Sequence, residues 1–64
     1  MHKINDELLI KWYIDYCVAQ DLNQSKIAKM VSMSRSWASM LVNGHIKKLR
    51  FDTRNRIKAI LGIQ

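Results

Sequence analysis

The chain has no proline, only two glycines and a single cysteine among its 64 residues. One cysteine excludes an internal disulfide and supplies no thiolate cluster for zinc. The longest apolar stretch of the N-terminal half is interrupted by Lys11 and Asp15, so we expect no membrane-spanning segment and no signal peptide. Residues 1–64 are therefore expected to form one domain, which at this size buries only about 60% of its unfolded surface. Dimerisation would supply extra stability.

Catalytic constellations are also missing from the sequence. His2 and His45 each lack a carboxylate or cysteine at metal-ligand spacing. Asp6 and Glu7 are adjacent, and adjacent side chains diverge on a helix, so they do not form an acid–base pair. Cys17 has no basic neighbour that would lower its pKa. The sequence predicts no enzyme activity, no metal site and no cofactor.

The charges of the chain are divided unevenly along its length. Residues 1–23 carry two Lys against four Asp and Glu, a net charge of −2. Residues 24–64 carry nine Lys and Arg against one Asp, a net charge of +8. A basic half of this kind favours an acidic partner such as nucleic acid, although a solvated basic surface without a partner is the alternative.

Apolar residues recur at helical spacing throughout, and both glycines stand where helices should end. The pattern predicts an all-α fold with helices over about residues 5–20, 24–31, 35–43 and 52–61, and a fifth short turn at 46–49 as an alternative. The expected N-terminal caps are Asn5, Asn23, Ser34, and Asp52 or Thr53. Gly44 and Gly62 are expected to stop the third and fourth helices.

Residues 24–44 read QSKIAKMVSMSRSWASMLVNG, two short helices joined by the polar break Ser32–Ser34. This arrangement is typical of a helix-turn-helix unit, which presents its second helix to the major groove of DNA. The window resembles, without gaps, the Cro and C1-type (lambda repressor-like) family of phages and bacteria. The matching positions are Gln24, Ile27, Ala28, Met33, Ser34, Leu41, Asn43 and Gly44, followed downstream by Thr53, Ile57 and Leu61–Ile63.

Two positions depart from the family pattern. Ser32 stands in the turn where the family often has glycine, so a strained or differently shaped turn is expected. Ala38 stands where a larger β-branched residue is usual. We expect the neighbouring Trp37 to fill that space in the core, in preference to stacking on a base.

The third predicted helix separates into two faces when residues are placed about 100° apart. Trp37, Ala38, Leu41 and Val42 form an apolar arc, whereas the opposite arc is mostly polar. Because residues near the start of such a helix reach base edges, we expect base contacts from Arg35, Ser36, Ser39 and Met40. Arg35 is the strongest of these candidates, because its guanidinium can bind guanine O6 and N7 together.

Phosphate contacts are expected around this helix. The family resemblance implies that Gln24 binds a phosphate and also braces the first residue of the recognition helix, here Arg35. It likewise implies a phosphate contact for Asn43. Charge and location add four further candidates, which position the protein on DNA without specifying sequence: Lys26, Lys47, Lys48 and Arg50.

The first predicted helix has more apolar surface than one core requires. Leu8, Leu9, Trp12, Tyr13, Tyr16 and Ala19 form a broad face expected to enter the core. Ile10, Ile14 and Val18 lie beyond it at intervals of four residues, as a ridge that suggests a partner surface. The alternative is that the N-terminal residues or Ile63 fold over this ridge.

These patterns predict a cytoplasmic, sequence-specific DNA-binding regulator that binds double-stranded DNA as a homodimer on an inverted repeat and occludes promoters, as the resembling phage repressors do. The alternative is an antirepressor or antitoxin-like module that binds another protein through the ridge on the first helix. A nonspecific architectural DNA binder is a third interpretation.

Overall fold

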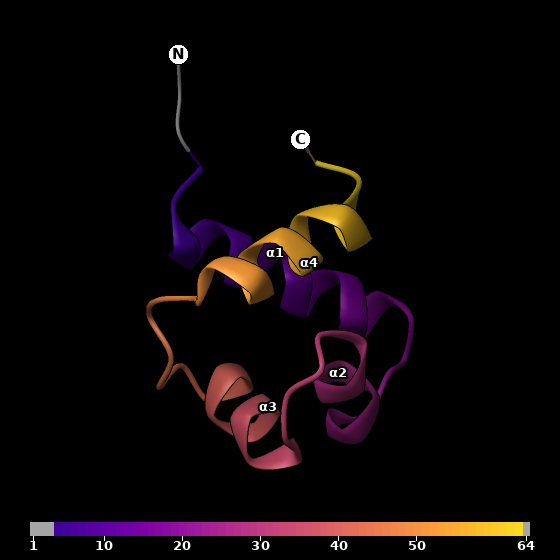
Figure 1. The fold of residues 1–64 in the computed structure, drawn as a ribbon. Helices are drawn as coiled ribbons and strands as arrows, with labels where there is room; N and C mark the ends of the chain where they lie inside the picture. Colours follow the sequence, from indigo (N-terminus) through magenta and orange to yellow (C-terminus); the bar gives the residue numbers. More distant parts are fainter. Residues whose placement is uncertain (1–3, 64) are drawn as a thin grey trace.

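The computed structural model describes residues 4–63, which form four α-helices and, within that range, no strand. The helices are α1 (Asp6–Ala19), α2 (Gln24–Met30), α3 (Arg35–Val42) and α4 (Phe51–Leu61). α1 packs on α4 at the end of the molecule that carries both termini, and α2 packs on α3 at the opposite end (Figure 1). The predicted all-α class is confirmed, whereas the prediction for His2 falls outside the described residues. No helix in residues 4–63 is long and apolar enough to span a bilayer.

Three helices begin with the same side-chain cap, as predicted. Asn5, Asn23 and Ser34 are extended, and the oxygen of each accepts a hydrogen bond from the backbone N–H three residues later. The donor–acceptor distances are 2.8, 2.9 and 3.1 Å. Each cap satisfies an N–H group that has no partner within the helix. The boundaries of α1, α2 and α3 therefore agree with the predicted ones to within one residue.

The N-cap of α4 was predicted wrongly as Asp52 or Thr53. The helix begins at Phe51, its N-cap is Arg50, and no side chain caps it. Thr53 cannot cap because its side chain is buried, with Oγ1 3.9 Å from the sulfur of Met33. The alternative fifth turn is also absent, because residues 45–50 are irregular. There the N–H of Leu49 donates to Asp6 and not to a helical carbonyl.

The core draws on all four helices, but α1 is rotated relative to the prediction. Ile10 and Cys17 are buried, whereas Leu8 and Trp12, expected in the core, are 37% and 36% exposed, and Ala19 is exposed as well. The buried hydrophobic residues are Leu9, Ile10, Tyr13, Cys17, Ile27, Ala28, Val31, Ala38, Leu41 and Ile57. Because α1 is apolar around most of its circumference, periodicity alone could not define which side faces inward.

A buried hydrogen bond accounts for the rotation of α1. The hydroxyl of Tyr13 donates to the carbonyl of Ile27 in α2 over 2.7 Å. A buried hydroxyl without such a partner would cost about 1–3 kcal/mol, so this bond selects one rotation. Burial raises the pKa of Tyr13 far above its ordinary value, with a smaller contribution from Cys17. Cys17 is fully buried in the core, and this burial raises the pKa of its thiol.

Two of the helix ends use a left-handed residue that is not glycine. Ser32 has φ 58° after α2, and Asp21 has φ 56° after α1. The N–H of Ser32 donates to the carbonyl of Lys29 at 3.1 Å, and the N–H of Met33 donates to the carbonyl of Ala28 at 2.9 Å. This is the Schellman pattern, in which a left-handed residue satisfies the last carbonyls of the helix. α3 ends in the same pattern, but with Gly44 at φ 80°. The strain expected at Ser32 is therefore present.

Replacing Ser32 with glycine is expected to stabilise the fold. Glycine removes a left-handed penalty of about 1–2 kcal/mol, against an entropic cost of about 0.5–1 kcal/mol in the unfolded chain. We expect the free energy of unfolding to rise by about 0.5–1 kcal/mol and Tm by about 2–8 °C. The matched control is Ser25→Gly, in the helical backbone of α2, where stability should fall. Equal losses from both substitutions in thermal unfolding would contradict the strain at Ser32.

Candidate nucleic-acid interface

The outer face of α3 carries exposed, mostly polar side chains. Arg35, Ser36 and Met40 are exposed, and Ser39 is half-buried. Ala38 and Leu41 are fully buried on the opposite face, and Trp37 is half-buried and packs on the core as predicted. Val42 was predicted to lie in the core, but it lies at the edge of the buried face and is 42% exposed. The four predicted base-contacting residues thus lie on one side of one helix.

The position of α3 is determined by α2 and by residues 31–34 between them, which together we call the α2–α3 unit. Ile27 and Ala28 of α2 join Ala38 and Leu41 of α3 in the buried cluster. The left-handed backbone at Ser32 reverses the chain, and the Ser34 cap starts α3 immediately afterwards. The unit forms the end of the molecule remote from both termini (Figure 1). α3 is therefore held against α2 with its outer face turned away from the core.

A hydrogen bond joins two of the predicted DNA-contacting residues. The side-chain amide of Asn43 donates to the hydroxyl of Ser39 over 3.4 Å. Ser39 was expected to reach a base and Asn43 a phosphate, and neither was expected to bind the other. Their spacing of four residues on one helix face is the signal that could have predicted the bond. The bond orients both side chains on the outer face of α3.

The predicted contact between Gln24 and Arg35 is not formed among the described residues. Gln24 is the first residue of α2 and is half-buried, whereas the side chain of Arg35 is exposed at the start of α3. No hydrogen bond joins the two in residues 4–63. Arg35 therefore keeps its donors available for a ligand.

Most cations of the second half of the chain have no carboxylate partner in residues 4–63. Ion pairs there involve only Lys11 with Asp15 and Arg54 with Asp6. The predicted phosphate-contacting cations Lys26, Lys47, Lys48 and Arg50 are all exposed.

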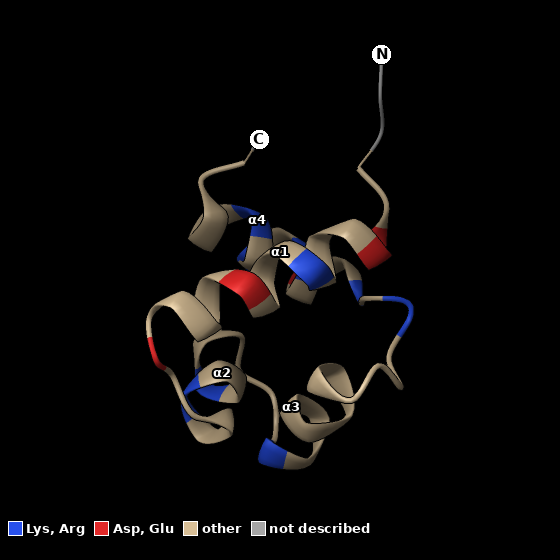
Figure 2. Cartoon of the chain, turned by 180° about the vertical axis from the view of Figure 1, so that it is seen from behind, with Lys and Arg blue, Asp and Glu red and all other residues tan. Residues whose placement is uncertain are grey.

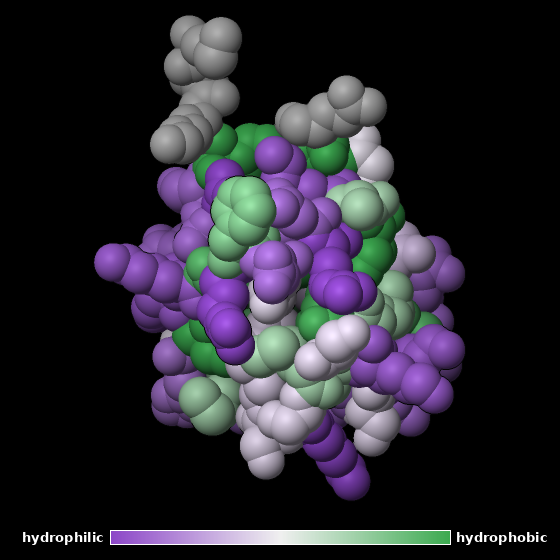
Figure 3. Space-filling model, in the orientation of Figure 1, coloured by the Kyte–Doolittle hydropathy of each residue, from purple (hydrophilic) through white to green (hydrophobic). Residues whose placement is uncertain are grey.

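Figure 2 shows the acidic residues mainly on α1 and in the segment that follows it, and a basic residue at the first turn of α3. In Figure 3 the lower centre of the surface is mostly pale, with strongly hydrophilic residues at the bottom and at both sides.

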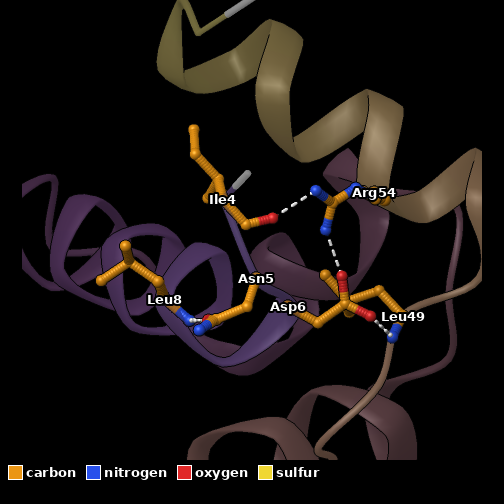
Figure 4. Close-up of polar contacts among 6 residues, drawn as sticks. All are labelled: Ile4, Asn5, Asp6, Leu8, Leu49 and Arg54. Carbon is orange, nitrogen blue, oxygen red and sulfur yellow. Dashed lines mark hydrogen bonds and ion pairs between the residues drawn. The ribbon is translucent and has the colours of Figure 1, made fainter. Parts of the chain in front are cut away.

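The basic connection, residues 45–50, is anchored to the start of α1. One oxygen of Asp6 accepts from the N–H of Leu49 at 2.9 Å, and the other binds the guanidinium of Arg54. The same guanidinium donates to the carbonyl of Ile4 (Figure 4). The carboxylate of Asp6 therefore joins the start of α1 to the basic connection and to α4. Sequence reasoning gave Asp6 only a role at the start of a helix, because partners 43 and 48 residues away leave no local signal.

Removing the carboxylate of Asp6 is expected to destabilise the fold and loosen the basic connection. Asp6 and Arg54 are only 24% and 22% exposed, so Asp6→Ala leaves partly buried donors without an acceptor. We expect a loss of about 1–3 kcal/mol in the free energy of unfolding. The control is Asp15→Ala, whose pair with Lys11 is 65% and 71% exposed and should contribute less than about 0.5 kcal/mol. Equal effects in chemical denaturation would contradict the anchoring role.

The predicted ridge on α1 is only partly exposed. Ile10 is a core residue with 7% exposure, Ile14 is half-buried, and Val18 is 71% exposed. Ile10 was misplaced because the rotation of α1 by the Tyr13 bond turns it inward. Ile10 and Ile14 nevertheless line a surface groove of about 260 Å³ between α1 and α3, which we call the α1–α3 groove. Ile63 is half-buried and packs on the core; it does not line this groove.

The arrangement thus places exposed cations and the outer face of α3 at one end of the molecule, and an apolar groove beside α1. In the described part of the chain, no three metal-ligating side chains come together. The resemblance of residues 24–44 to the Cro and C1-type family rests on the sequence pattern alone. Compared with family models, curated proteins and solved structures, the chain has no match.

Proposed function

We propose that this chain is a sequence-specific DNA-binding transcriptional regulator of the Cro and C1 type, in which the α2–α3 unit acts as a helix-turn-helix. It binds double-stranded DNA as a dimer on an inverted repeat and represses by occluding promoters. It acts in the cytoplasm of a bacterial host and originates from a phage or another mobile element. The observation that carries the proposal is the exposed face of α3, with Arg35 unpaired in its first turn.

The geometry supports insertion of α3 into a major groove. The groove of B-DNA admits one α-helix, and residues in the first turns of that helix reach base edges. Arg35, Ser36, Ser39 and Met40 occupy those turns on the outward face. On such an inverted repeat the two α3 helices of a dimer would lie about 34 Å apart, one turn of duplex.

The salt dependence of binding tests the electrostatic part of the proposal. Each phosphate neutralised contributes about −0.9 to the slope of log K against log salt, so a dimer with six to ten contacts should lose about 10³–10⁵ in affinity between 50 and 200 mM salt. The variant Lys47→Ala/Lys48→Ala should make that slope shallower in fluorescence anisotropy. Lys58→Ala, in the last turn of α4, is the control and should leave the slope unchanged. Binding that does not respond to salt would contradict the proposal.

The α1–α3 groove supports a second candidate function, an antirepressor or antitoxin-like module that binds another protein. That function uses Ile14 and Val18 and does not use the outer face of α3. The two candidates differ at Arg35, because a partner bound in the groove should remain bound after Arg35→Ala. Pull-down of a defined partner by wild type and by Arg35→Ala would separate them.

A further inference from the structure

The α1–α3 groove combines an apolar floor with exposed apolar residues at its margin. Its lining includes Ile10 and Ile14 of α1, Val42 at the end of α3, and Ile46 just beyond α3. Val42 is 42% exposed, and Val18, one turn beyond Ile14 on α1, is 71% exposed. Contiguous exposed apolar residues on a small domain mark an interaction surface.

The charges beside this groove are balanced, unlike those of the rest of the chain. Glu7, Lys11 and Asp15 follow one another at intervals of one turn along α1, and Lys47 lies on the opposite side of the groove. These are two charges of each sign, whereas the whole chain has a net charge of +6. A second copy approaching any of the basic surfaces would be repelled, but it would not be repelled here.

The order of these charges is self-complementary under two-fold symmetry. If two α1 helices pack antiparallel about a point midway between Lys11 and Asp15, Lys11 of each copy faces Asp15 of the other. Within one copy the two side chains lie 3.6 Å apart and are 71% and 65% exposed, so both can reach across such an interface. The same packing covers Ile14 and Val18 with the second copy.

We propose that the α1–α3 groove face binds a second copy of this chain, with the two α1 helices antiparallel and Lys11 paired with Asp15 across the two-fold axis. α1 crosses the molecule above α3 (Figure 2), so a two-fold axis that is perpendicular to α1 and runs in the direction from α1 to α3 keeps both α3 helices at the same end of the dimer. The inference deepens the proposed function by naming the dimer surface, and it rests on that function for the inverted-repeat geometry. Self-association itself is measurable without DNA.

Charge exchange at Lys11 and Asp15 tests the proposal. Lys11→Glu and Asp15→Lys each turn the two opposite-charge contacts of the homodimer into like-charge contacts. Sedimentation equilibrium of the full chain should therefore give each variant a dimer dissociation constant at least about tenfold higher than that of wild type. An equimolar mixture of the two variants restores both opposite-charge contacts and should recover the wild-type dissociation constant. A misfolded variant would not be rescued in this way. A wild-type chain that stays monomeric up to about 1 mM, or a mixture no tighter than the single variants, overturns the proposal.

Two apolar substitutions with matched exposure test the location of the interface. Val18→Ser should weaken the dimer, whereas Phe51→Ser, at a residue 76% exposed on α4, should leave it unchanged. The proposal is overturned if Phe51→Ser weakens the dimer and Val18→Ser does not. A dimer without DNA binding would overturn the proposed function and leave this inference intact. Sequence-specific DNA binding by a chain that stays monomeric up to about 1 mM would overturn this inference and leave the DNA-binding role of α3 intact.

Discussion

Arg35→Ala is expected to weaken binding to the preferred duplex and to relax sequence preference at one position of each half-site. A bidentate contact from arginine to guanine O6 and N7 contributes about 1–3 kcal/mol of discrimination, which is about fivefold to 150-fold in affinity for each half-site. Arg35 is exposed in the first turn of α3, on the same face as Ser36 and Ser39. Fluorescence anisotropy with the preferred duplex, and with one changed only at that guanine, measures both effects.

Arg35→Lys is the matched variant for this prediction. Lysine keeps the positive charge but loses the fork of donors, so nonspecific affinity should be retained while the guanine preference falls. The fold should be unaffected by either change, because the Arg35 side chain is exposed and contributes no ion pair within the described residues. If Arg35→Ala weakens all duplexes equally, Arg35 contacts a phosphate and the base-reading role is wrong.

Leu41→Ala is expected to have the largest effect on stability. Leu41 is fully buried in α3, in the cluster that also contains Ile27 and Ala28 of α2. Truncating a buried leucine costs about 2–5 kcal/mol. A 64-residue chain has about 3–10 kcal/mol of total stability, so a large share of the free energy of unfolding should be lost, and all of it if the total lies at the lower end of that range. Circular dichroism during thermal unfolding should show a greatly lowered transition or none.

Met40→Ala is the control for Leu41→Ala, because Met40 is the adjacent residue of α3 and is 46% exposed. Its free energy of unfolding should stay within about 0.5 kcal/mol of wild type. Equal losses for the two variants would mean that α3 is not oriented with Leu41 inward. The face assigned to DNA would then be wrong as well.

The helix boundaries were predictable because their signals are local. Asn5, Asn23 and Ser34 cap helices through bonds that span only three residues. Gly44 and Gly62 have positive φ at the ends of α3 and α4. The exposed and buried faces of α3 also followed from periodicity, except at Val42, because polar and apolar residues on this helix are well separated.

Features that depend on distant residues were not predictable. The rotation of α1 depends on the bond from Tyr13 to Ile27, and α1 itself is too uniformly apolar to indicate an inward side. A fifth turn in the basic connection was predicted only as an alternative, and the segment is irregular, with the N–H of Leu49 donating to Asp6. The uncapped start of α4 likewise reflects the burial of Thr53 by tertiary packing.

For the candidate site, the helix face on which the residues lie was predictable, but their side-chain contacts were not. The pattern of residues 24–44 brought Arg35, Ser36, Ser39 and Met40 to one helix face, and the structure places them there. It did not predict that Ser39 would bind Asn43, or that Arg35 would lie free of Gln24. Those details depend on side-chain conformation, which one sequence pattern does not specify.

Selection of bound sequences from a random duplex pool, at about 150 mM salt where nonspecific binding is weak, tests the central claim most directly. Wild type and Arg35→Ala are carried through the same rounds. The account predicts that wild type enriches an inverted repeat with a guanine in each half-site, and that Arg35→Ala loses the preference for that guanine. Failure of wild type to enrich any sequence, with binding that disappears as salt rises, would contradict it.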